Sequence, residues 1–165
     1  MNNVETLVRE IQNSVFGDPW HGAPVKKILE DITEKLAYSR PLINAHNIVE
    51  LTLHMWAWTE EVTGRLKGNP PTDPPMGDWP NAEDYKHEGW SEIQNKLYVS
   101  TKNLINILKN FPEENFSLVV GGLRNPPLGT GITYEAMVHG LAQHNAYHSG
   151  QIALLKKYFN RQQFN

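Results

Sequence analysis

Apolar residues recur at intervals of three and four along four long segments of this 165-residue chain, and this spacing constrains the fold more than any other feature. Side chains three and four positions apart lie on one face of an α-helix, so each segment predicts an amphipathic helix. The segments cover residues 4–15, about 47–67, 81–111 and 134 to about 159. Four such helices bury their apolar faces by packing together, which predicts an all-α fold built as a four-helix bundle.

Capping residues predict where the long helices begin, and helix breakers predict where they end. Asn47 and Thr133 stand directly before the second and the last helix, and a glutamate three residues after Asn47 completes a capping-box spacing. Asn81 is the expected cap of the third helix, which the Phe-Pro pair at 111–112 ends. The first helix ends at the Gly-Asp-Pro cluster of residues 17–19.

Shorter elements and two long connections link these helices. A short helix is expected with Pro24 at its first position, and a further helical turn opens at Asp31, with Glu34 at a capping-box distance. Residues 68–80 contain five prolines and predict a surface connection. Residues 112–132 form a second connection, whose FSLVVG segment is expected to be extended. Both are longer than a simple up-and-down bundle needs, which indicates crossover connections or the rim of an active site.

Length and composition narrow the classes of function. One domain, residues 1–165, is expected, and a chain of this size buries enough surface to fold without a metal or a disulfide. The net charge is −3 and no basic stripe is present, which disfavours nucleic-acid binding. The absence of cysteine excludes disulfides, thiolate metal sites and a cysteine nucleophile. No apolar run is long enough for a membrane span and no secretory leader is evident, so the cytoplasm is the expected location.

The last helix places two histidines where core residues are expected. Its inward face carries Met137, Leu141, His144, His148, Ile152, Leu155 and Phe159. Imidazoles four residues apart project from one helix face and lie close enough to share a metal ion. His54 occupies a similar inward position on the second helix, between Leu51 and Trp58. Three neutral imidazoles from two packed helices would hold a divalent metal and leave positions for water or substrate, as catalytic sites do.

Other interpretations stay open from the residues alone. The three histidines could be packed, hydrogen-bonded core residues, or they could bind a metal or small ligand without catalysis. Zinc-protease chemistry is not supported, because no glutamate follows His144 to serve as a general base. Gln151 lies one turn beyond His148, where it would either contact a water on the metal or the substrate, or make an interhelical hydrogen bond.

The remaining histidines and the tryptophans are weaker candidates. His46, just before the Asn47 cap, is interpreted as a helix-start residue, and His87 lies on a solvated face. His139 lies off the inward stripe. His21 is interpreted as a surface-loop residue, with a place at the mouth of the site as the alternative. Trp56 and Trp58 are expected in the core or the pocket wall. Trp79 and Trp90 are candidates for the rim of the site, although burial alone would also account for aromatic side chains at these positions.

Two segments carry a resemblance to a known family. They are residues 46–58, HNIVELTLHMWAW, and residues 139–152, HGLAQHNAYHSGQI. The DPWHG turn at 18–22 and the GDWP segment at 77–80 are also similar. In these residues and in their order along the chain, the sequence resembles the DinB-like superfamily, also called the DinB/YfiT-like superfamily.

The resemblance implies a four-helix bundle of unusual connectivity with one or two short extra helices, frequent homodimers and no DNA binding. It also implies a divalent metal ion held by His54, His144 and His148. Three imidazoles do not choose among zinc, nickel, iron and manganese. Similar proteins include transferases and isomerases that use bacillithiol or mycothiol, and others described as metal-dependent hydrolases. The expected function is therefore that of a metal-dependent enzyme acting on a small molecule, either as a hydrolase or as a low-molecular-weight-thiol S-transferase.

Overall fold

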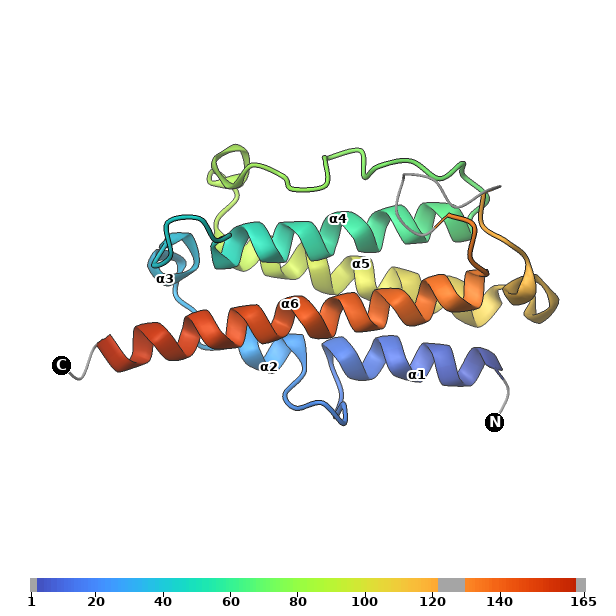
Figure 1. Ribbon diagram of the computed structural model, residues 1–165, viewed down its shortest axis with the longest axis horizontal. Coiled ribbons are helices and arrows are strands. Elements are labelled where there is room, and N and C mark those ends of the chain that lie inside the picture. Colours follow the sequence, from blue (N-terminus) through green and yellow to red (C-terminus); the bar gives the residue numbers. More distant parts are fainter. Residues whose placement is uncertain (1–2, 122–129, 163–165) are drawn as a thin grey trace.

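The computed structural model describes residues 3–121 and 130–162, whose regular secondary structure is helical (Figure 1). The four long helices are α1 (Asn3–Val15), α4 (Ile48–Leu66), α5 (Trp90–Asn110) and α6 (Tyr134–Gln162). The short elements are the helices α2 (Val25–Leu29) and α3 (Glu34–Tyr38) and the 3₁₀ turns η1 (Ala82–Tyr85) and η2 (Glu113–Ser117). The described residues contain no β-strand, and the predicted all-α fold is confirmed.

The long helices lie side by side, and α6 runs along most of the length of the molecule (Figure 1). Helices α1 and α4 each pack against both α5 and α6. Their buried side chains form two apolar clusters, one around Met55, Ile93 and Ile152 and the other around Leu104 and Leu141. Most of α4 is buried, so its inward side chains meet those of α6 inside the bundle. None of the described helices is long and apolar enough to cross a membrane.

Local capping fixes the start of α4 and α6. The Asn47 side chain accepts a hydrogen bond from the Glu50 backbone N–H at 2.9 Å, and the Glu50 carboxylate accepts one from the Asn47 N–H at 3.0 Å. At α6, the Thr133 hydroxyl accepts a hydrogen bond from the Ala136 N–H at 3.1 Å. Both predicted caps are confirmed, and a cap of this kind contributes about 1 kcal/mol.

Two other predicted helix starts are wrong. Asn81 caps the 3₁₀ turn η1, where its side chain accepts from the Glu83 N–H at 3.2 Å, and α5 begins only after Gly89. Gly89 has a φ of 82°, a left-handed conformation that interrupts a helix and that glycine adopts without strain. The turn expected at Asp31 is helix α3, which directly follows its true cap, Thr33.

The two long connections have different structures. Residues 68–80 contain no helix or strand, as predicted, and run back along α4 (Figure 1). The described part of the second connection contains η2 and one antiparallel bridge between Val119 and Thr133. Phe116 lies inside η2, so the extended backbone begins at Leu118, later than the sequence predicts. The rest of that connection, residues 122–129, lies outside the described residues.

Candidate metal centre

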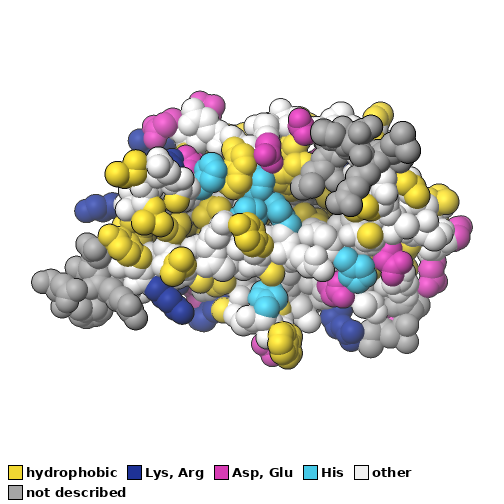
Figure 2. Space-filling view, viewed as in Figure 1, with side chains coloured by type: hydrophobic (Ala, Val, Ile, Leu, Met, Phe, Trp, Pro, Cys, Tyr) yellow, Lys and Arg dark blue, Asp and Glu magenta, His cyan; other side chains and the backbone are white. Residues whose placement is uncertain are grey.

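Three histidines from two helices come together inside the bundle. His54 lies on α4, and His144 and His148 lie one turn apart on α6. One ring nitrogen from each lies within 4.8 Å of the others, and the Nε2 atoms of His54 and His144 are 2.8 Å apart. Figure 2 shows a group of histidine side chains near the centre of one face, bordered by hydrophobic side chains. The structure thus brings together the three residues whose spacing predicts an inward direction.

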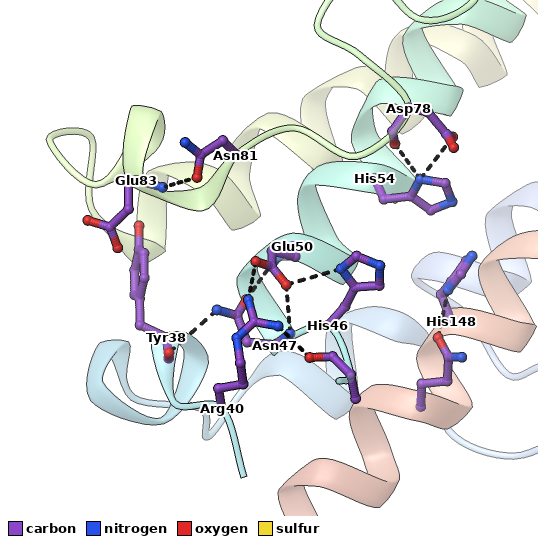
Figure 3. A network of polar contacts seen from close by, with 12 residues as sticks. Tyr38, Arg40, His46, Asn47, Glu50, His54, Asp78, Asn81, Glu83 and His148 are labelled. Carbon is purple, nitrogen blue, oxygen red and sulfur yellow. Dashed lines mark hydrogen bonds and ion pairs between the residues drawn. The ribbon is translucent and has the colours of Figure 1, made fainter. Parts of the chain in front are cut away.

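Protein acceptors hold the outer nitrogen of two of these rings. His54 Nδ1 lies 2.5 Å from the backbone oxygen of Asp78 and 3.4 Å from its carboxylate (Figure 3). His148 Nδ1 lies 2.8 Å from Gln151 Oε1, so the bond of Gln151 is within α6 rather than between helices. A carbonyl oxygen can only accept, so each Nδ1 carries the proton and each Nε2 keeps its lone pair. Contacts of this kind fix the tautomer and orientation of metal-binding histidines.

The third ring, His144, lacks such an acceptor. Among the described residues, its buried Nδ1 and the buried Oδ1 of the adjacent Asn145 make no hydrogen bond of normal geometry, although the Asn145 side chain acts on His144 to raise its pKa, against the effect of burial. Its Nε2 faces the lone pair of His54 Nε2 and carries the proton in the metal-free state. A metal ion at His144 Nε2 would shift that proton to Nδ1. His144 Nδ1 would then be a hydrogen-bond donor and Asn145 Oδ1 an acceptor, so the two atoms are complementary when the site holds an ion.

Burial keeps all three imidazoles neutral. Burial, together with the charges that His148 and His54 would carry, lowers the pKa of His144 to about 3. Burial also lowers the pKa of His54, although the nearby Asp78 opposes it, and lowers the pKa of His148, although Gln151 opposes it. Neutral imidazole is the form that binds a metal, so the rings are in their ligating state at neutral pH.

This set of donors fits a divalent metal ion. Imidazole nitrogen suits zinc, copper, iron and nickel. Three protein ligands that leave further positions open are typical of catalytic rather than structural zinc sites. His54, His144 and His148 could therefore hold an ion while leaving room for a further ligand.

Sequence comparison assigns the family. A model of the DinB superfamily matches residues 21–152, which include α4, most of α6 and all three histidines of the centre. The chain belongs to the DinB superfamily. Comparisons with curated proteins and with solved structures gave no match. The family resemblance of residues 46–58 and 139–152 is thereby confirmed.

In this DinB-superfamily chain, two neighbouring residues of the 68–80 connection pack against the centre. Trp79 stacks on His54, with ring centroids 3.8 Å apart and an interplanar angle of 5°, and is 37% exposed, in keeping with the predicted rim position. The Asp78 carboxylate accepts from the Trp58 Nε1–H at 2.7 Å, in addition to the backbone contact with His54. Asp78 belongs to the GDWP segment that carries the resemblance, but the sequence did not indicate its role, because its main contact uses a backbone oxygen that every residue has.

His46 is more than the helix-start residue that the sequence indicates. Its ring stacks on Trp79, with centroids 3.6 Å apart and planes inclined by 1°. Its Nδ1 lies 3.1 Å from Glu50 Oε2, the carboxylate that also belongs to the capping box (Figure 3). His46 therefore belongs to the surroundings of the centre, although it is not among the three converging rings.

The other histidines of this DinB-superfamily chain lie away from the centre. His139 is off the inward stripe, as predicted, and its Nδ1 lies 2.5 Å from Glu10 on α1. His21 is exposed on its loop, as the preferred interpretation predicts, and lines a separate cavity of about 320 Å³ with His139 and Glu10, so the alternative, the mouth of the site, is wrong. His87 is exposed, as predicted.

The tryptophans divide between core and rim. Trp90 is buried in the core and its Nε1–H donates to the Ile32 backbone oxygen at 2.7 Å, so of its two interpretations burial is confirmed and the rim position is wrong. Trp58 is buried, as predicted. Trp56 is partly buried, with its ring edge-on to Tyr85.

Proposed function

We propose that this protein is a metal-dependent enzyme that acts on a small molecule, with a divalent ion bound by His54, His144 and His148. The strongest support is the convergence of three neutral imidazoles, two of which already have their outer nitrogens held by Asp78 and Gln151. Histidines that merely fill a core satisfy their buried nitrogens with protein partners. Among the described residues, His144 Nδ1 makes no hydrogen bond of normal geometry, which favours the metal interpretation. Membership of the DinB superfamily is compatible with metal binding.

The protein's own residues would bind the ion and orient the imidazole rings that hold it. Asp78 and Gln151 turn His54 and His148 so that their Nε2 atoms face the ion. A divalent ion held there would polarise a carbonyl group or lower the pKa of water or of an incoming thiol. The largely buried surroundings of His54 and His148 strengthen these electrostatic interactions, because little water is present to screen them.

Two reaction classes share this site. One is hydrolysis, and the other is S-transfer from a low-molecular-weight thiol such as bacillithiol. The chain has no cysteine, so an attacking thiol would have to come from a cosubstrate. The alternative is a non-catalytic protein that binds a metal or a small ligand in the same place. Metal content distinguishes histidines that only fill the core from histidines that bind an ion. Turnover of a substrate distinguishes an enzyme from a binding protein.

The test starts with metal analysis of protein purified without a histidine tag, followed by zinc, nickel, iron and manganese titrations of chelated protein. Holo protein is then assayed with simple esters and amides, and separately with an electrophile plus bacillithiol. Each assay is repeated after chelation. Turnover that needs both metal and thiol supports the transferase, and metal-dependent turnover without thiol supports the hydrolase. Turnover that survives verified metal removal refutes the mechanism, and metal binding without turnover supports the binding protein.

A homodimer is the proposed assembly. Tyr147, Leu154 and Tyr158 are 66%, 66% and 42% exposed, and their spacing places them along one outer face of α6. A row of exposed apolar side chains on one helix face is typical of an interaction surface. Light scattering after size exclusion should give twice the 18.8 kDa chain mass, and Leu154→Glu should give the monomer. A wild-type monomer at high protein concentration would refute the dimer.

A further inference from the structure

Trp79 lies between two histidine rings. Its centroid is 3.8 Å from that of His54 and 3.6 Å from that of His46, with interplanar angles of 5° and 1°. Two imidazoles cannot both lie this close to the centre of one indole face without overlapping, so they cover opposite faces. The result is a three-ring stack in the order His46, Trp79, His54, and the His54 end belongs to the candidate metal centre.

Both ends of the stack are anchored. At one end, His54 donates its Nδ1–H to the backbone oxygen of Asp78, and the Asp78 carboxylate accepts a hydrogen bond from Trp58. At the other end, His46 contacts the Glu50 carboxylate, which also accepts a hydrogen bond from the Asn47 backbone N–H at the start of α4. The two end rings of the stack therefore come from α4, which carries His54, and from His46 just before the cap of α4, while the connection carries the middle ring, Trp79. The contacts of His46 and His54 with Glu50 and Asp78 are drawn in Figure 3.

The connection that carries Trp79, residues 68–80, is itself fixed at a second point, and we call it the strap. Glu61 Oε1 accepts from the Thr72 N–H at 2.9 Å, and Arg65 Nη2 donates to the Thr72 oxygen at 3.1 Å. Glu61 and Arg65 are both buried and pair with each other at 2.9 Å. The strap is thus attached to α4 at Thr72 and at Asp78, on either side of Pro74 and Pro75.

We propose that Trp79 is a positioning residue that holds the plane of the His54 ring and thereby strengthens metal binding. This inference rests on the metal binding proposed above. The Asp78 oxygen fixes one ring nitrogen but leaves the ring able to pivot about that hydrogen bond, and a flat neighbour removes this freedom. A bound divalent ion also draws electron density from the imidazole, so the electron-rich indole face stabilises the metal-bound ring more than the free ring.

Three substitutions separate this role from simple packing. Trp79→Leu keeps apolar volume but removes the flat face, and Trp79→Phe keeps a flat face. Trp56→Leu is the matched control, because Trp56 lies on α4 near His54 but packs on Tyr85 instead. Zn²⁺ affinity is measured by titration calorimetry, and ligand geometry by the visible absorption of Co²⁺-loaded protein. Circular dichroism establishes that each variant is folded.

Trp79→Leu should bind Zn²⁺ about 10-fold or more weakly, as is typical when the partner of a ligating histidine is lost, and its Co²⁺ bands should shift. Trp79→Phe should stay within about threefold of wild type, and Trp56→Leu should match it. Trp79→Ala takes the place of Trp79→Leu if the latter does not fold. Wild-type affinity and Co²⁺ bands in folded Trp79→Leu would overturn the inference while leaving the metal proposal intact. Absence of Zn²⁺ and Co²⁺ binding in the wild type would overturn the metal proposal itself.

Discussion

The metal-free protein should lose stability as the pH falls below 6.5, and His144 should cause much of this loss. Burial beside His148 and His54 lowers the pKa of His144 from 6.5 to about 3 in the folded chain. Below pH 6.5 the unfolded chain therefore takes up a proton that the folded chain does not. Because the unfolded state binds more protons, the free energy of unfolding falls with the pH. The contribution is fully present above pH 6.5 and is lost progressively toward pH 3.

The expected size of the effect follows from these values. Each pH unit below 6.5 removes about 1.4 kcal/mol per proton taken up on unfolding, so lowering the pH from 8 to 5 removes about 2 kcal/mol through His144 alone. Burial also lowers the pKa of His54 and of His148, and both act in the same direction. Domains of this kind are stable by about 5 to 15 kcal/mol in total, so the loss is readily measurable.

Urea unfolding in the presence of a chelator, at about pH 8, 6.5 and 5, measures this dependence. His144→Gln removes the titrating ring, so its free energy of unfolding should fall by about 2 kcal/mol less than that of the wild type over this range. His87→Gln changes an exposed histidine and should follow the wild type. If His144→Gln keeps the full pH dependence of the wild type, burial does not keep this imidazole neutral and the reasoning fails.

Alanine at each of the three site histidines should abolish one-to-one zinc binding in titration calorimetry, whereas His87→Ala should leave it unchanged. Full zinc occupancy in His144→Ala would rule out the three-histidine site. Chelation should lower the melting temperature but keep the helical circular dichroism, because the apolar core does not need the ion, and free zinc at 100 times its Kd should add about 2.7 kcal/mol. A random-coil spectrum of the metal-free protein would contradict this. Glu61→Gln should cost about 3 to 5 kcal/mol in urea unfolding, because it removes the carboxylate buried beside Arg65. A cost under about 1 kcal/mol would show that the pair contributes no more than a surface ion pair.

Helix starts can be predicted from the sequence where the deciding contacts are local. The side chains of Asn47 and Thr133 each bind a backbone N–H within one turn, so their spacing is enough. Asn81 makes the same kind of contact, yet its turn does not continue into α5. A cap marks where a turn begins, but the length of the helix depends on how later residues pack. Ala82 reaches the core from η1, but no residue from 83 to 89 is buried, and buried positions at helical spacing resume only from Trp90, after the left-handed backbone of Gly89.

The candidate site could be predicted only in part for a similar reason. His54, His144 and His148 follow the apolar period of their own helices, which predicts that each points inward. Which inward residues of α4 meet those of α6 depends on how the two helices slide and tilt against each other, and the spacing within one helix does not determine this. The resemblance of two segments to one family supplied the link between the helices, and the structure supplies the distances.

The strap could not be placed at all from periodicity, because the path of its backbone, rather than an apolar stripe, fixes its contacts. Its five prolines restrict the unfolded chain and so reduce the entropy lost when the strap is laid along α4. Apolar packing is often as stabilising as a buried ion pair, but it cannot satisfy backbone groups. Glu61 and Arg65 bind both the N–H and the oxygen of Thr72, which accounts for a charged pair in this part of the bundle. Since the same strap supplies the acceptor for His54, loosening it at Thr72 should also weaken the orientation of the metal centre.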